Sequence, residues 1–137
     1  MKKILFFLSF ILLSAGLFAQ EYELYRCSEI GTRTKTTYSW TEWTFTEVDM
    51  LIRICLNESK IEFDNKAETT FYISYEYSST KGIDNDGDKY TKKTWSGYDN
   101  NGKRCHLVSI DYPNLTSRNF ILEYSDAELF FATDIIR

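Results

Sequence analysis

In VDMLIRICL, residues 48–56, every second residue from Val48 to Leu56 is apolar. A β-strand points successive side chains to opposite faces, so this spacing predicts a strand with one buried face. Asp49, Arg53 and Cys55 fall on the other face. The buried face is predicted to carry Val48, Met50, Ile52, Ile54 and Leu56.

Similar patterns follow along the chain. Asn57 to Lys60 reads as a turn, and Ile61 and Phe63 resume the alternation. In ETTFYISYEYS, residues 68–78, one face is predicted to carry Phe71, Ile73, Tyr75 and Tyr77.

TWSGYDNNGKRCHLVSI, residues 94–110, predicts a hairpin. Its strands are expected at Tyr90–Tyr98 and Arg104–Ile110, joined by a reversal at Asp99–Gly102. Asp and Asn tolerate turn conformations, and glycine supplies a positive φ where a short loop requires one.

With the front segment YELYRC, a threonine-rich run around Arg33–Phe45, and two C-terminal runs, the chain holds about eight strands. No connection is long enough for a crossover helix, so sequence neighbours are expected to pair in an antiparallel meander. The sequence therefore predicts an all-β fold, a small closed or nearly closed barrel, with a two-sheet β-sandwich as the alternative.

The first 19 residues have the features of a signal peptide: Lys2 and Lys3 precede an apolar run, and Ala19 offers a small residue for cleavage. We therefore expect export to the periplasm or the extracellular space. Cleavage would leave residues 20–137 as a single all-β domain, without a transmembrane segment.

The charge balance excludes some partners. The chain has 16 basic and 20 acidic residues; without the two leader lysines the balance is 14 against 20, a net charge of −6. Nucleic acids and anionic membranes attract basic surfaces, so neither is an expected partner. The oligomeric state is not predicted.

No familiar catalytic or cofactor motif is present, so the sequence predicts neither an enzyme nor a cofactor. His106 is the only histidine, and it should point away from its neighbour Cys105 on a strand. The run Asp84–Asp88 offers oxygen ligands, but it does not follow the EF-hand order. We read it as a polar hairpin tip and predict no metal site.

Three cysteines, Cys27, Cys55 and Cys105, are an odd number for an exported chain. One disulfide with one remaining thiol is expected under oxidising conditions. If Val108 and Ile110 mark the inner face of their strand, Cys55 and Cys105 both point outward, and we predict that they pair.

The aromatic residues suggest two functions. A barrel with eight strands can hold a small apolar or amphipathic ligand, and the predicted lining is Ile52, Ile54, Phe71 and Ile73. Alternatively, exposed rings bind a glycan or a protein; the candidates are Trp40, Trp43, Trp95 and Tyr98. In one regular strand Trp40 and Trp43 would lie on opposite faces, so that one packs in the core.

The order W-x-x-W, W-x-G-x-D-x-x-G-x-x-C and LEYSD resembles that of small exported, mostly uncharacterised calycin-like proteins of Bacteroidota. The likeness covers most of the chain after the leader, and it implies an exported β-barrel-like domain without an activity. It rests on Trp40, Trp43, Trp95, Gly97, Asp99, Gly102 and Cys105.

Overall fold

The computed structural model describes residues 22–65, 68–115 and 117–135; the predicted signal peptide lies outside them. Among the described residues, no helix has the length and apolar character needed to cross a membrane. The elements are β1 (Glu23–Thr34), β2 (Thr44–Cys55), the 3₁₀ turn η1 (Leu56–Glu58), β3 (Lys60–Phe63), β4 (Thr70–Ile83), β5 (Lys89–Asp99), β6 (Arg104–Tyr112), β7 (Ser117–Glu123) and β8 (Ala127–Ile135).

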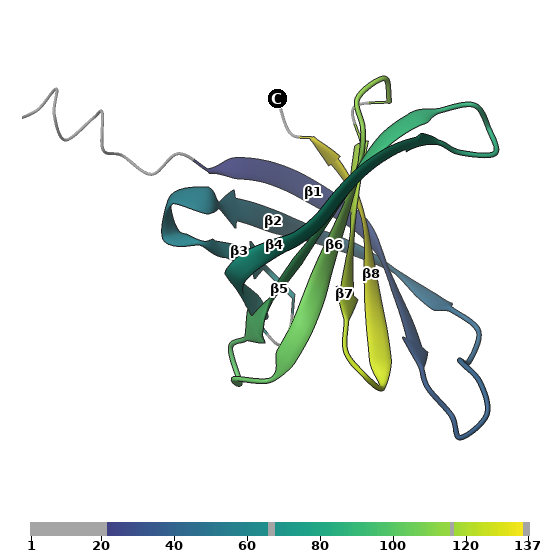
Figure 1. The fold of residues 1–137 in the computed structure, drawn as a ribbon, viewed down its shortest axis with the longest axis vertical. Helices are drawn as coiled ribbons and strands as arrows, with labels where there is room; N and C mark the ends of the chain where they lie inside the picture. The colour runs from purple at the N-terminus through teal and green to yellow at the C-terminus, as the bar shows by residue number, and fades with distance from the viewer. Residues whose placement is uncertain (1–21, 66–67, 116, 136–137) are drawn as a thin grey trace, which may run out of the picture.

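The eight strands form a closed antiparallel barrel (Figure 1). Each strand pairs with the next, and β8 returns to pair with β1 along most of its length. The predicted meander and barrel are confirmed, and the sandwich is not formed. Closure gives both edges of the meander a partner, which an open sheet would leave exposed.

The two ends of the barrel differ in which connections they carry. The upper end has the β2–β3, β4–β5 and β6–β7 connections and the start of β1; the lower end has the other connections. Figure 1 shows the β4–β5 hairpin extending beyond the ring at the upper right.

The middle of the barrel is filled with side chains. Tyr25 packs edge-on against Phe120, which in turn contacts Phe63, and Phe63 lies 4.5 Å from Phe131 between ring centroids. All four rings are almost fully buried. The central lumen is therefore a packed core.

The predicted inner face of β2 is largely confirmed. Met50, Ile52 and Ile54 belong to the core, and Val48 packs against it. Leu56 is instead 58% exposed, because the chain leaves the strand there and turns through η1 into β3.

The alternation predicted for β4 holds only for its first part. Phe71 is buried and Ile73 packs against the core, but Tyr75 and Tyr77 are exposed. The register with β5 shifts between Ile73 and Tyr75 and again between Glu76 and Ser78. Such bulges insert extra residues and change which face the later side chains occupy.

The run Arg33–Phe45 does not form a strand of its own, contrary to prediction. β1 ends at Thr34 and β2 begins at Thr44, and between them Lys35 and Trp40 form an isolated bridge. This segment connects two strands at the lower end of the barrel.

The contact between β3 and β4 is the shortest in the ring. It comprises three residue pairs, from Lys60↔Tyr72 to Glu62↔Thr70. Among the described residues, Ser74–Ile83 of β4 pairs with β5 alone, and its other edge has no strand partner.

Candidate functional site at the upper end of the barrel

A partly enclosed pocket of about 250 Å³ lies at the upper end of the barrel, above the packed core. Four strands and the 3₁₀ turn supply inward-facing side chains from both sides of the lumen, and β7 adds one more. The lining residues are Glu23, Ile54, Leu56, Thr91, Lys93, Trp95, Ser109, Asp111 and Arg118.

The alternation of side chains along each strand explains why these residues point into the lumen. On β7, Phe120 and Leu122 are fully buried in the core, so Arg118 points into the lumen as well. On β5, Trp95 packs against the core, and Lys93 and Thr91 follow on the same face. The inner faces of β1, β5, β6 and β7 thus change from apolar to polar towards the upper end, while that of β2 stays apolar.

Arg118 forms the floor of the pocket. Its guanidinium lies 5.1 Å from the ring centre of Tyr25, which belongs to the core below it. Nη1 lies 3.1 Å from a carboxylate oxygen of Glu23, and Nη2 lies 3.4 Å from one of Asp111. The Tyr25 hydroxyl also donates to Glu23, and burial together with this hydrogen bond raises the pKa of Tyr25.

One donor of this network is not satisfied. Nε of Arg118 is buried and has no hydrogen-bond partner. An unpaired buried donor costs about 1–3 kcal/mol and is uncommon in folded proteins. The floor of the pocket thus holds one buried donor without a partner in the protein.

The walls combine apolar and charged groups. Ile54 and Leu56 come from the end of β2 and from η1, and Trp95 comes from β5, three strands further around the ring. Lys93 lies at the exposed rim and has no ion-pair partner among the described residues. The pocket thus offers a flat ring, aliphatic side chains and an unpaired cation.

Only some of the residues that we predicted to bind a ligand line the upper pocket. Ile52 and Phe71 are fully buried in the core, and Ile73 packs against it, so these three do not line the pocket. Ile54 does line it, and so does Trp95. A ligand therefore has room at one end of the lumen but not at its centre.

Sequence reasoning missed Arg118, Lys93, Glu23 and Asp111. A usable signal exists in RNFIL, residues 118–122, because the alternation of Phe120 and Leu122 extends back to Arg118. A charged residue at a position that the alternation assigns to the buried face is unusual, and such a residue often marks a functional site.

A wider hollow of about 570 Å³ lies at the lower end. It is lined by Ile30, Val48 and Met50 on the inner faces of β1 and β2, and by Asp64 and Asn65 of the β3–β4 connection. Residues 66–67 of the same connection lie outside the described part of the chain.

Trp40 and Trp43 do not lie on opposite faces, contrary to prediction. The Arg33 guanidinium lies 4.8 Å from the ring centre of Trp40 and 4.7 Å from that of Trp43. Arg33 also pairs with Glu128 at 2.7 Å. Both rings can reach one cation because they lie on the β1–β2 connection and not in a regular strand.

Trp43 has further ring contacts outside the barrel core. It stacks on Phe45, and both rings meet Phe130 edge-on. Gly31 lies beneath them: a Cβ there would be 2.6 Å from the Phe45 ring. These contacts give the two tryptophans a structural role.

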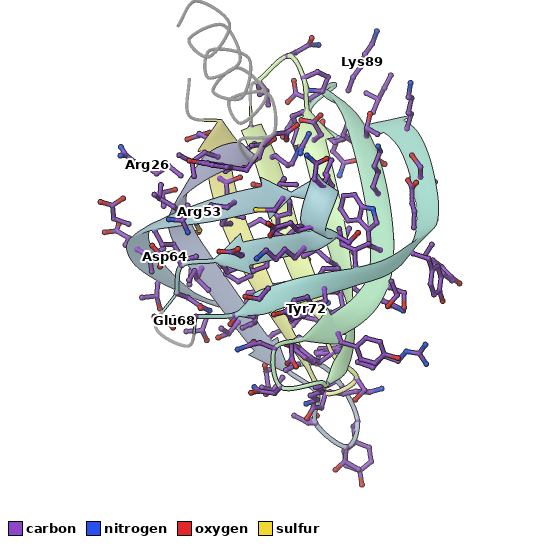
Figure 2. The ribbon with its side chains drawn as sticks, turned by 90° about the vertical axis from the view of Figure 1, so that its left-hand side faces the viewer. Arg26, Arg53, Asp64, Glu68, Tyr72 and Lys89 are labelled. Carbon is purple, nitrogen blue, oxygen red and sulfur yellow. The ribbon has the colours of Figure 1, made fainter. Side chains whose placement is uncertain are left out.

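Tyr98 is exposed on the outer surface. It lies opposite Tyr72 in the β4–β5 register, and the two residues are 42% and 47% exposed. Figure 2 shows Tyr72 on β4 at the outside of the sheet. Trp95 lies three residues before Tyr98 and therefore points inward.

The predicted Cys55–Cys105 disulfide is not formed, and all three cysteines are buried thiols. Cys105 belongs to the core, so its strand faces the other way from the prediction. Cys55 lies outside the core cluster on β2, and β3, β4 and β5 lie between it and β6. A disulfide requires the two Cα atoms within about 7 Å, which this arrangement excludes.

Cys105 and His106 lie on opposite faces, as predicted. Cys105 is buried in the core, and burial raises the pKa of its thiol to about 11. His106 stacks on Tyr77, with ring centres 5.8 Å apart, on the outside. A nucleophile and base pair is therefore not assembled from these two residues.

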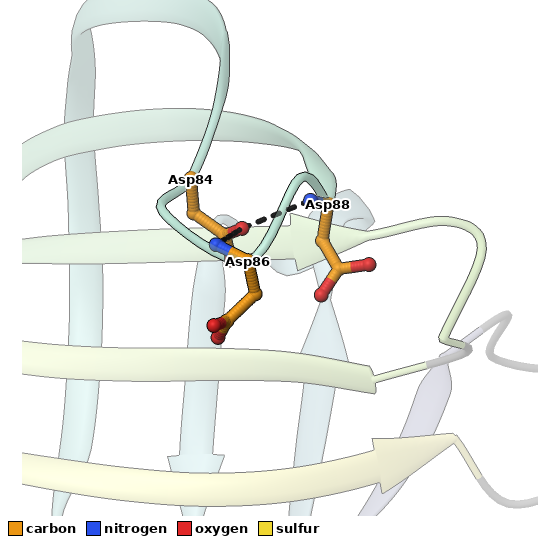
Figure 3. Close-up of side chains that lie close together, drawn as sticks. All are labelled: Asp84, Asp86 and Asp88. Atoms are coloured by element: carbon orange, nitrogen blue, oxygen red, sulfur yellow. Dashed lines mark hydrogen bonds between the residues drawn. The ribbon is translucent and has the colours of Figure 1, made fainter.

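Asp84, Asp86 and Asp88 gather at the tip of the β4–β5 hairpin, as Figure 3 shows. One oxygen from each lies within 4.8 Å of the others. However, Oδ1 of Asp84 accepts hydrogen bonds from the backbone N–H groups of Asp86 and Asp88. Gly87 adopts a positive φ of 82°, so turn formation accounts for the composition of this tip.

Comparison of the chain with protein-family models, curated proteins and solved structures gives no match. The resemblance to exported proteins of Bacteroidota therefore stays a prediction.

Proposed function

We propose that the protein is an exported, non-enzymatic barrel that binds a small amphipathic molecule in the pocket at its upper end. The observation that carries the proposal is the combination of Trp95 and Ile54 with Arg118 in a recess above a packed core. Binding sites for small molecules commonly join apolar walls to a few polar groups.

The pocket volume limits the size of the ligand. A cavity of about 150 Å³ accommodates benzene, and pockets for drug-sized molecules begin at about 300 Å³. At about 250 Å³ the pocket suits a compact molecule of one or two rings. A long acyl chain would need the central lumen, which Tyr25 and Phe120 fill.

We propose a non-enzymatic role because the candidate nucleophile, Cys105, is buried and is not paired with a histidine base. The pKa of Cys105 is raised by burial, and its neighbour His106 lies on the other face of the sheet. The groups that line the pocket are suited to holding a ligand: an arginine ion-paired with two carboxylates, a lysine and two hydroxyl groups.

Titration with 2-naphthol by calorimetry tests the pocket. Thr91→Trp would fill the recess and should reduce binding at least tenfold. Thr94→Trp adds the same ring on the outer face of β5, next to Val108 in the register, and should leave binding unchanged. Equal binding by the two variants, each verified as folded by circular dichroism, would refute the proposal.

A second candidate function is glycan binding on the outer surface. The supporting observation is that Tyr72 and Tyr98 lie side by side on β4 and β5 with about half of each side chain exposed. Flat exposed rings can stack on sugars. Binding to a glycan array that is lost in Tyr98→Ala but retained in Thr91→Trp would favour this surface over the pocket.

A further inference from the structure

The charged residues of the upper pocket differ in whether they form ion pairs within the protein. Glu23 and Asp111 each accept an interaction from the Arg118 guanidinium, and Glu23 also accepts the Tyr25 hydroxyl. The two acidic groups of the pocket are thus already paired by residues of the protein. A cationic ligand would have to displace Arg118 to reach them.

Lys93 is in the opposite situation. It lines the pocket, it is exposed at the rim, and it forms no ion pair with any described residue. It lies two residues before Trp95, on the same inner face of β5, and both residues line the pocket. The two acidic and two basic residues of the lining balance in charge, and Lys93 is the one of the four that forms no ion pair with a described residue.

We infer that the ligand of this pocket is an anion, with a carboxylate at Lys93 and a compact aromatic body between Trp95 and Ile54. The inference rests on the proposed function and specifies its ligand class. A neutral head group would leave Lys93 without a counter-charge. The carbon stem of a lysine can also cover apolar surface while its ammonium pairs with the anion.

Three probes that share one ring system test the head group: 2-naphthoate, 2-naphthamide and 2-naphthylmethylamine. Calorimetry should show 2-naphthoate binding at least tenfold tighter than the other two. Its affinity should fall as salt is raised, while that of the neutral amide should not, because salt screens exposed charges.

Two adjacent lysines provide the matched variants. Lys93→Gln should abolish the preference for 2-naphthoate over 2-naphthamide. Lys92→Gln removes the same charge one residue earlier, on the outer face of β5, and should retain the preference. An equal loss in both variants would mean a general charge effect and would overturn the inference.

The remaining outcomes separate this inference from the proposed function. Equal affinities for 2-naphthoate and 2-naphthamide, or tighter binding of the amine, would overturn the anionic ligand and leave the pocket in place. Failure of all three probes to bind would overturn both.

Discussion

The hydroxyl of Tyr124 donates a hydrogen bond to Oδ2 of Asp99, 2.8 Å away, and so joins the β5–β6 turn to the residue after β7. Oδ1 of the same carboxylate accepts the backbone N–H groups of Asn101 and Lys103. Burial alone would raise the pKa of Asp99, but these hydrogen bonds outweigh it and lower the pKa.

Asp99→Asn should therefore reduce stability by about 1–2 kcal/mol at pH 7, since hydrogen bonds to charged groups are stronger than neutral ones. A lowered folded-state pKa means that the carboxylate stabilises the protein above the pKa of the unfolded chain, about 3.9. This contribution is lost as the pH falls through the folded-state pKa. Urea unfolding at a series of pH values from 7 to 2 measures this. The difference in free energy of unfolding between Asp99→Asn and the wild type should disappear below about pH 4. Asp126→Asn, at an exposed ion pair, serves as control.

Arg33→Lys should destabilise the protein nearly as much as Arg33→Ala, by about 1–2 kcal/mol. Lysine keeps the charge but cannot place a planar group between Trp40 and Trp43 while bonding Glu128. Unfolding in urea measures both variants. Full stability of Arg33→Lys would show that charge alone matters. Arg26→Ala should change little, because the Arg26–Asp49 pair is exposed.

Gly97→Ala should destabilise the barrel by about 3 kcal/mol or more, because overpacking that the backbone cannot relieve is costly. A Cβ at this position would overlap the carbonyl oxygen of Tyr72 and lie 2.9 Å from the Phe71 ring. Gly102→Ala has open space and a positive φ, so it should cost only about 1 kcal/mol of backbone strain. Similar thermal shifts for the two variants would contradict the close approach at Gly97.

The native protein should react negligibly with a thiol reagent at pH 8. Cys27, Cys55 and Cys105 are at most 5% exposed, and burial raises the pKa of each thiol. Denaturation without a reductant should release three thiols. A count of one would show that a disulfide forms, and it would contradict the arrangement of β2 and β6 described above.

Regular alternation and turn chemistry made much of the fold predictable. The inner face of β2 from Met50 to Ile54 and the reversal at Asp99–Gly102, with its positive φ at Gly102, follow directly from local sequence. The bulges of β4 do not, because they depend on how β4 and β5 pair and not on either strand alone.

The site was harder to predict for two reasons. Val108 is buried although it lies outside the core cluster, so its apolar character indicated the wrong inner face for β6 and hence the wrong side for Cys105. The pocket also depends on how many residues of each strand lie above the packed core. That depth is set by the stagger of strands across the ring, and no single strand encodes it.

The three residue pairs between β3 and β4 are few beside the eight between β5 and β6. Local opening costs least where the fewest backbone hydrogen bonds must break. The contact between β2 and β3 is almost as short, with four residue pairs, so the two shortest contacts of the wall both involve β3. Local opening of the ring should therefore begin on either side of the short strand β3, while the longer contacts between the other strands stay closed.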